Sequence, residues 1–344
     1  MPTKPLSEIR DQVGETNQTV TGLRVETGKV AEFARATRDD DPVYRDPDAA
    51  AERGFEAVPA PLTFTRVAAF PRYRPAALDN RLGFDLGLEP VVIHGEQAYE
   101  YDRPVRVGDV LHGETTLAEV YRREGRRGGT MTFVEYETAY YDQGGERVLT
   151  ERSTAIETGQ PIDDGNESEG TGREDTPDPA AVREREDRAR YLDIAAGEGT
   201  TLDGPTGVVA DEVAVGDAGP ELVVEDIQRP DFVKYAGASG DFNPVHYSGP
   251  YARATGNRAV FGQGMLTAGY GAHMVADWFG LGNVTAYRTR FESRLWPGDT
   301  LSVTGEVTDV DSVADGTRVT ASLTVESETD TLVTGDATAV LPAR

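Results

Sequence analysis

The sequence predicts an α+β fold with two similar halves, each combining one long helix with an antiparallel sheet. One supporting observation is length, since 344 residues exceed the size of a typical single domain, about 150 residues. Another is a repeat, because matching segments recur about 200 residues later in the chain. The third is periodicity, which changes from helical to alternating within a half. A duplicated domain explains these observations together.

Three kinds of segment recur in both halves. The first is a helix that leads into an acidic turn, the second is expected to open a long helix, and the third is a strand with a Gly-Asp turn. In that order, the matched segments are 33–44 with 235–246, 57–63 with 259–267, and 107–111 with 297–301. We therefore expect the same turns, and a long helix, in each half.

In the second half, the hydrophobic pattern distinguishes helices from strands. Residues 230–237 suit a short helix with proline in its first turn. Strict alternation over 287–295 and 319–326 predicts antiparallel strands with one buried face. Residues 264–281 suit a long helix whose apolar residues repeat every four positions, at Leu266, Tyr270, Met274 and Trp278. We assign this stripe to the core rather than to a cofactor site.

A segment between the halves is rich in acidic residues, glycine and proline and has few apolar residues. Such a segment cannot bury enough surface to offset the entropy of ordering it. We therefore predict an N-terminal domain over 1–158, an acidic linker over 159–205 and a C-terminal domain over 206–344.

The composition narrows the class of protein. The net charge of −26 argues against nucleic-acid binding, which needs a basic surface. The absence of cysteine excludes disulfide scaffolds and thiolate sites. Because there is no long apolar run and the N-terminus does not look like a signal peptide, we expect a soluble, cytoplasmic protein without a membrane partner.

An acidic surface with few lysines also resembles proteins adapted to high salt, where the repulsion between like charges is screened. An ordinary acidic protein remains the alternative.

The segment Ser239-Gly240-Asp241-Phe242-Asn243-Pro244-Val245-His246 carries the clearest chemical signal. Glycine and Asn-Pro favour a tight turn, which can bring the carboxylate of Asp241 next to the imidazole of His246. Together these two groups can hold one water and perform acid–base chemistry near neutral pH. By spacing alone, an acidic turn beside a structural histidine is the simpler interpretation.

The longer pattern resembles the signature of MaoC-type, (R)-specific enoyl-CoA hydratases, which have the hot-dog fold. The likeness continues through Phe261-Gly262-Gln263-Gly264-Met265-Leu266 and the turn at 297–299. The first half resembles the N-terminal domain of double-domain MaoC-like dehydratases, through its helix and acidic turn and through 94–101 and 103–109. The resemblance implies a double hot-dog fold, with two tandem domains that each wrap a sheet around a central helix.

The resemblance also implies roles for residues of the second half. Asp241 and His246 would be the catalytic pair that deprotonates a water for addition to C3 of a trans-2-enoyl thioester, with the proton delivered to C2. Asn243 would brace the loop and, with Gln263, line the substrate site. The backbone N–H of Gly264 would polarise the thioester carbonyl, in keeping with the partial positive charge of a helix N-terminus.

Two positions depart from the family pattern, and they leave the positioning of the substrate open. Gln263 stands where the family usually has histidine, and Ala272 stands where it has a small hydroxyl residue. The first half departs further. Tyr44 stands where the second half has His246. Prolines, which have no N–H, stand in the segment that matches Gly264. We therefore expect a degenerate first domain that helps bind the substrate, with Asp39 as a relic.

Arginines are the expected ligands of the phosphates of coenzyme A, and we single out Arg72 and Arg74 as substrate-binding candidates. A salt-bridged outer face is the simpler interpretation of a second arginine set on one strand, at Arg288, Arg290 and Arg294. We interpret the remaining histidines as structural, because no cluster with metal-ligand spacing accompanies them; these are His94, His112 and His273.

The expected function is that of a hydro-lyase acting on an acyl-CoA thioester, with no cofactor besides the CoA of the substrate and no metal. The fused two-domain form with a halophilic composition resembles mesaconyl-CoA hydratases, which interconvert mesaconyl-CoA and β-methylmalyl-CoA. The alternatives are a general (R)-specific enoyl-CoA hydratase or 3-hydroxyacyl dehydratase, and a non-catalytic acyl-CoA-binding module. A further homodimer stays open, because two hot-dog domains in one chain can already pair with each other.

Overall fold

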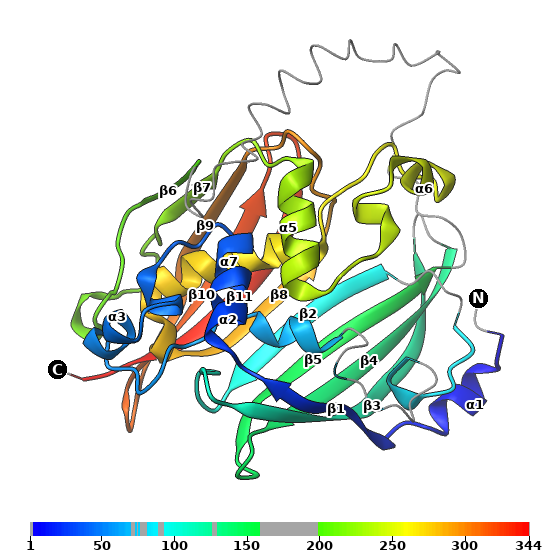
Figure 1. Ribbon diagram of the computed structural model, residues 1–344, viewed down its shortest axis with the longest axis horizontal. Coiled ribbons are helices and arrows are strands. Elements are labelled where there is room, and N and C mark those ends of the chain that lie inside the picture. The colour runs from blue at the N-terminus through cyan, green and yellow to red at the C-terminus, as the bar shows by residue number, and fades with distance from the viewer. Residues whose placement is uncertain are drawn as a thin grey trace.

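A computed structural model describes residues 3–69, 73, 75, 81–88, 93–125, 129–158 and 199–343. One 11-stranded antiparallel sheet runs through both halves, in the order β1-β3-β4-β5-β2-β8-β11-β10-β9-β7-β6. The strands β2 and β8 meet at its centre, where Tyr99 lies opposite Tyr287. The order β1-β3-β4-β5-β2 is repeated as β7-β9-β10-β11-β8, so the two halves are related by a pseudo-two-fold (Figure 1).

The strands and helices have the following bounds. The N-terminal strands are β1 (Thr16–Arg24), β2 (Ile93–Tyr101), β3 (Val110–Gly125), β4 (Gly129–Tyr141) and β5 (Arg147–Thr158). The C-terminal strands are β6 (Thr200–Asp203), β7 (Glu221–Val224), β8 (Val284–Phe291), β9 (Leu301–Val313), β10 (Gly316–Glu326) and β11 (Thr331–Leu341). The α-helices are α1 (Leu6–Arg10), α2 (Thr27–Ala36), α3 (Pro47–Glu52), α5 (Arg229–Ser239), α6 (Gly249–Ala254) and α7 (Gly264–Phe279).

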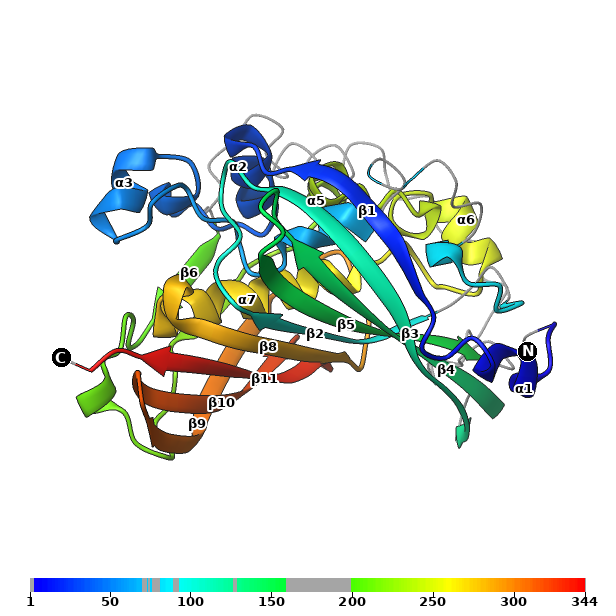
Figure 2. The same ribbon diagram turned by 90° about the horizontal axis from the view of Figure 1, so that it is seen from below.

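The predicted double hot-dog fold is confirmed: the larger helices lie on one face of the curved sheet (Figure 2). The long helix α7 packs there with most of its side chains buried. Its glycines allow this close approach, because a Cβ on Gly269 would lie 2.6 Å from Cγ2 of Thr37 and one on Gly271 would lie 2.5 Å from the hydroxyl of Tyr287. The matched helices α2 and α5 lie side by side across the two halves (Figure 1), with ring centroids of Phe33 and Tyr235 5.7 Å apart.

The prediction of a long helix after residues 57–63 of the first half is wrong for the described residues. There the chain forms only the short 3-10 helix η2 (Phe64–Ala69). The physical reason is the pairing of the preceding segment: Pro59 forms a bridge with Arg106, and the amide of Ala60 donates to the carbonyl of Val105 at 2.8 Å. Extended pairing and the missing N–H of proline both oppose the start of a helix here.

The Gly-Asp turns of the two halves are built alike, and each precedes a strand. In the first, Oδ2 of Asp109 accepts a hydrogen bond from the backbone amide three residues earlier at 3.0 Å, and Asp299 does the same at 2.8 Å. Gly108 and Gly298 have φ of 98° and 97°, a conformation that favours glycine. The same local geometry at matched positions supports a duplicated origin.

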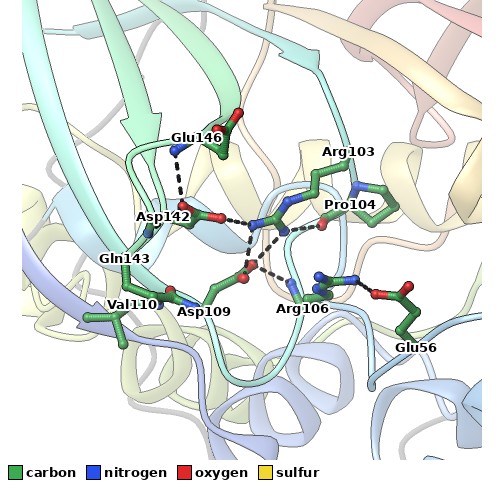
Figure 3. A network of polar contacts seen from close by, with 10 residues as sticks. Glu56, Arg103, Pro104, Arg106, Asp109, Val110, Asp142, Gln143 and Glu146 are labelled. Atoms are coloured by element: carbon green, nitrogen blue, oxygen red, sulfur yellow. Dashed lines mark hydrogen bonds and ion pairs between the residues drawn. The ribbon is translucent and has the colours of Figure 1, made fainter.

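In the N-terminal half, the Gly-Asp turn is part of a polar network (Figure 3). Both arms of Arg103 bind the carboxylate of Asp109, at 2.8 and 3.0 Å, and one arm also reaches Asp142 at 2.9 Å. Arg106 forms an ion pair with Glu56 beside it. This network ties the turn to the hairpin between β4 and β5.

The segment predicted as a linker, 159–205, lies mostly outside the described residues, which resume at Gly199. Its last part is not linker, because Thr200–Asp203 form β6 and pair with β7 at the edge of the sheet. Within the described part of the chain, no helix is long and apolar enough to cross a membrane.

Candidate active site

A tight turn after α5 presents the predicted acid–base pair. Helix α5 ends at Gly240, whose φ of 86° is left-handed and suits a glycine C-cap. Oδ1 of Asp241 then accepts a hydrogen bond from the amide of Asn243 at 3.3 Å. Asn243 in turn caps the 3-10 helix η6 (Pro244–His246), since its Oδ1 accepts from the amide of Val245 at 3.3 Å. These short-range hydrogen bonds reverse the direction of the chain, so that His246 faces Asp241.

The two side chains come together with a gap between them. Nε2 of His246 lies 3.9 Å from Oδ2 of Asp241, and the side chains are 9% and 15% exposed. The other ring nitrogen of His246, Nδ1, lies 2.8 Å from the carbonyl oxygen of Phe261. A carbonyl can only accept, so Nδ1 carries the hydrogen and Nε2 of the neutral ring presents a lone pair to the carboxylate.

The environment keeps this imidazole neutral. Burial lowers the pKa of His246 below its usual value of 6.5, the carboxylate of Asp241 opposes that shift, and the guanidinium of Arg66 adds to it. A neutral Nε2 and a carboxylate oxygen are both hydrogen-bond acceptors. A water placed about 2.8 Å from each can therefore donate one hydrogen to each. The pair is thus arranged to hold a water and remove a proton from it.

The N-terminus of α7 supplies a hydrogen-bond donor near this pair. Gly264 is the first residue of α7 and is exposed, and within the described residues its N–H has no acceptor. The first amides of a helix lack partners inside it and carry partial positive charge. An exposed amide of this kind can stabilise an oxygen that gains negative charge.

The side chain of Gln263 lies behind this helix end rather than on its surface. It is 1% exposed, and its Nε2 donates to the carbonyl of Phe232 in α5 at 3.1 Å. It therefore connects α5 to the start of α7 and orients the two elements that carry the site.

Asn243 is exposed on the loop. A direct contact of Gln263 or Asn243 with substrate stays a prediction. The candidates Arg72 and Arg74 lie outside the described residues.

The first half repeats the loop but not the chemistry. Oδ1 of Asp39 accepts from the amide of Asp41 at 3.1 Å, and Asp41 caps η1 (Pro42–Tyr44) as Asn243 caps η6. Tyr44 is buried at the position that matches His246. Within the described residues, no three His, Cys, Asp or Glu side chains gather as a metal site.

A cavity of about 260 Å³ lies in the N-terminal half, on the inner face of its sheet. Its wall comes from β1 to β5 and from η2, and it includes Arg66, His94, Thr115, Tyr140 and Glu151. This cavity lies in the half where η2 stands in place of a long helix. Sequence reasoning missed Arg66, because a single arginine without a motif gives no signal.

Contacts place the cavity next to the acid–base pair. The ring of His94, in the cavity wall, packs on Phe291 with centroids 4.8 Å apart. Phe291 in turn borders the start of α7, since a Cβ on Gly264 would lie 3.1 Å from its ring. Arg66, also in the wall, is close enough to His246 to lower the pKa of that ring alongside the larger effect of burial. The ring of Phe291 therefore lies between the start of α7 and the cavity wall.

Comparison with known proteins matches each half to a dehydratase domain. A family model for a FAS1-like dehydratase domain region matches residues 11–151, and one for a MaoC like domain matches 217–329. A "UPF0336 protein" of Thermobifida fusca (strain YX) is 34% identical over 141 residues, which cover 41% of this chain and 88% of that protein. A second "UPF0336 protein", of Streptomyces avermitilis, is 34% identical over 138 residues, covering 40% and 87%.

Solved structures match almost the whole chain. A MaoC-like dehydratase superposes with a TM-score of 0.74 and 25% identity, covering 97% of this chain and 99% of that one. A conserved hypothetical protein of Mycobacterium tuberculosis with a double hotdog fold superposes with a TM-score of 0.60 and 15% identity, covering 95% and 96%. The match thus spans both halves and the junction between them.

Proposed function

Because the chain belongs to the MaoC-like dehydratase family, we propose that it is a hydro-lyase that adds water reversibly to the 2,3 double bond of an enoyl-CoA thioester. The observation that carries this proposal is the 3.9 Å gap between Nε2 of His246 and Oδ2 of Asp241, beside the exposed first amide of α7. One water fits between these acceptors, and the thioester oxygen fits the amide.

The reaction balances with these groups alone. Nε2 of His246 takes a proton from the water held by Asp241, and the oxygen bonds to C3 of the enoyl group. The electron pair of the double bond moves toward the thioester oxygen, where the N–H of Gly264 stabilises the negative charge. The proton then goes from the imidazole to C2, so one molecule of water is added in all. The reverse sequence eliminates water from a 3-hydroxyacyl thioester.

Within this class, the proposed substrate is mesaconyl-CoA, which would give β-methylmalyl-CoA. Three features support it: the fused two-domain form, the acidic composition with few lysines, and a cation, Arg66, in the cavity beside the pair. A general (R)-specific enoyl-CoA hydratase or 3-hydroxyacyl dehydratase is the alternative enzyme, and a non-catalytic acyl-CoA-binding module is the alternative of another class.

A side-by-side assay separates these candidates. Crotonyl-CoA and mesaconyl-CoA are offered to the purified protein in high salt, and loss of the enoyl-thioester absorbance is followed. We expect turnover of both, with mesaconyl-CoA preferred. Turnover of neither substrate would contradict an enzyme, and a preference for crotonyl-CoA would contradict the narrower choice.

Variants of the pair test the mechanism. Asp241→Asn and His246→Gln should each lower kcat by about 10³-fold, within the range for loss of a general acid–base group. Binding of an unreactive saturated acyl-CoA, measured by calorimetry, should stay within a few-fold of wild type. A binding module would instead keep its function in both variants.

A further inference from the structure

A buried tyrosine lies on the helix that leads into the acid–base pair. Tyr235 belongs to α5, which ends two residues before Asp241, and its side chain is 0% exposed. Within the described residues, its phenolic oxygen has no hydrogen-bond partner. Buried hydroxyls are normally hydrogen-bonded, because leaving one unpaired destabilises the folded protein. The hydroxyl of Tyr235 is therefore available to a water or to a group of the substrate.

The packing of this ring does not require its hydroxyl. Residues 235–246 match 33–44 in the duplicated sequence, so Phe33 is the counterpart of Tyr235. Both rings are fully buried, and they meet where α2 and α5 lie side by side, with centroids 5.7 Å apart (Figure 1). A plain phenyl ring thus fills the matched position in the half that has Tyr44 in place of His246. The hydroxyl occurs in the half that carries the acid–base pair.

Two hydrogen bonds tie the backbone of Tyr235 to that of Asp241. Oγ of Ser239 donates to the carbonyl of Tyr235 at 2.7 Å and accepts from the amide of Asp241 at 3.2 Å. Ser239 is 1% exposed, so bulk water does not compete for these bonds. The carboxylate-bearing residue is therefore held close to the residue that bears the hydroxyl.

The charges around this hydroxyl place it between the pair and the cavity. Burial is the largest influence on its pKa; the guanidinium of Arg66 lowers that pKa and the carboxylate of Asp241 raises it. Together these effects hold the pKa of Tyr235 well above its usual value of 10. The phenol therefore keeps its proton near neutral pH and serves as a hydrogen-bond donor rather than as a base.

The water held by the pair has room for one more hydrogen bond. It donates one hydrogen to Asp241 and one to His246, and its oxygen keeps two lone pairs. One lone pair forms the bond to C3, and the other can accept a hydrogen bond.

We propose that Tyr235 is a further catalytic residue, whose hydroxyl donates a hydrogen bond to the oxygen of this water and, in the reverse direction, to the 3-hydroxyl group of the substrate. The proposal rests on the proposed hydratase function and deepens it, because it names a third contact of the reacting oxygen. The hydroxyl keeps its hydrogen throughout, so the proton balance of the reaction is unchanged.

Tyr235→Phe tests the proposal, because it removes the hydroxyl and keeps the ring. With whichever of mesaconyl-CoA and crotonyl-CoA is turned over faster, kcat should fall by about 10-fold or more. The midpoint of urea unfolding should stay the same or rise, because a hydroxyl without a protein partner is lost. Calorimetry should give a Kd for butyryl-CoA, which has no oxygen at C3, within about two-fold of wild type. An unchanged kcat or a lower midpoint would overturn the proposal.

Tyr270→Phe is the matched control. Tyr270 is equally buried, on α7, and within the part of the chain that the structure describes its hydroxyl also has no hydrogen-bond partner. The charged groups that act on it are Asp231 and Arg38 rather than Asp241. In this variant kcat should stay within about two-fold of wild type. Equal losses of kcat in both variants would attribute the effect to the loss of any buried hydroxyl and overturn the proposal.

The pH profile distinguishes contact with the reacting oxygen from an effect on the imidazole. A neutral hydroxyl carries no charge, so the acid limb of kcat/KM, set by His246, should not move in Tyr235→Phe. A shifted limb would mean that the hydroxyl acts through His246 and would contradict the proposed contact.

Failure of this proposal differs from failure of the proposed function. Wild-type turnover of neither substrate contradicts the hydratase function. Wild-type turnover together with an unchanged kcat in folded Tyr235→Phe contradicts only the role of Tyr235.

Discussion

Nε2 of His273, on α7 of the C-terminal half, lies 3.7 Å from Oδ1 of Asp39 in the N-terminal half. The same nitrogen lies 3.2 Å from Oδ2 of Asp277, one helical turn further along α7. The side chains of Asp39 and His273 are only 5% and 10% exposed. Burial raises the pKa of Asp39 to about 6, against the opposing charge of His273. Burial alone would lower the pKa of His273, but Asp39 and Asp277 together raise it.

This cluster predicts that the protein loses stability as pH rises. Both groups bind protons more tightly in the folded state, so their contributions are fully present below the unfolded pKa values and are lost above the folded ones. For Asp39 the loss falls between pH 3.8 and about 6, and for His273 it begins above the ordinary value of 6.5. The other groups facing the cluster are Asp41, Tyr44 and Arg53.

Urea unfolding between pH 5 and pH 9 at constant high salt measures this effect. His273→Gln should flatten the decline of the unfolding free energy above pH 6.5. Equal slopes in wild type and His273→Gln would contradict the prediction.

Repeats in the sequence predicted the duplication, since the matched turns at Asp109 and Asp299 are built alike and the strand order of one half is repeated in the other. The pairing of Asp39 with His273 could not be predicted in that way. It joins residues in different halves, and it depends on how α7 packs against Thr37 across the side-chain-free surface of Gly269. Neither this pairing nor this packing produces a periodic pattern in the sequence.

Only part of the candidate site could be predicted from the sequence, for a similar reason. Asp241 and His246 lie five residues apart, so a local turn is enough to bring them together. Arg66 lies in the other half of the chain, lines the cavity there and lowers the pKa of His246 after the larger effect of burial, and no local pattern marks it. The first-half helix was predicted wrongly because the match to 259–267 carried more weight than the prolines at 59 and 61, which keep that segment extended.

The second prediction concerns the pH dependence of the proposed reaction. The lone pair on Nε2 of His246 is needed to take a proton, so kcat/KM should fall as pH drops through the pKa of this ring. Burial places that pKa below 6.5, and Arg66 lowers it further. The acid limb of the profile should therefore lie below pH 6.5 and move to higher pH in Arg66→Gln, because a nearby positive charge is removed. An acid limb above pH 7 in wild type would assign the proton transfer to another group.

A third prediction concerns an ion pair that joins the two halves. Nη2 of Arg38 lies 2.9 Å from Oδ2 of Asp231, with side chains 12% and 7% exposed, and Nη1 donates to the carbonyl of Glu225 at 2.7 Å. Arg38→Ala would leave the buried carboxylate of Asp231 with only the more exposed Lys234, whose Nζ lies 3.7 Å from its Oδ1. The unfolding free energy should therefore fall by about 2 kcal/mol or more. Urea denaturation measures the change.

The control for this ion pair is one at the surface. Arg318→Ala removes the partner of Asp311, and both side chains of that pair are about half exposed. Its effect should stay below about 1 kcal/mol, as is usual for surface pairs. Similar losses in the two variants would show that the burial of Arg38 does not add to the stability of the junction.

The last prediction isolates the amide at the start of α7. Proline is well tolerated at the first position of a helix, since its missing N–H has no intrahelical partner there. The preceding residue, Gln263, already has φ −64° and ψ 136°, which is the extended conformation that a residue before proline prefers. Gly264→Pro should therefore keep the helix but remove the proposed donor to the thioester oxygen, and kcat should fall by about 10²- to 10³-fold.

Gly264→Ala is the matched variant, because it introduces the same Cβ, 3.1 Å from the ring of Phe291, and keeps the N–H. If the amide stabilises the developing negative charge, the alanine variant should retain most of the kcat that the proline variant loses, while thermal melts of the two remain within a few degrees. Equal losses of kcat in both would attribute the effect to crowding against Phe291 and remove Gly264 from the mechanism.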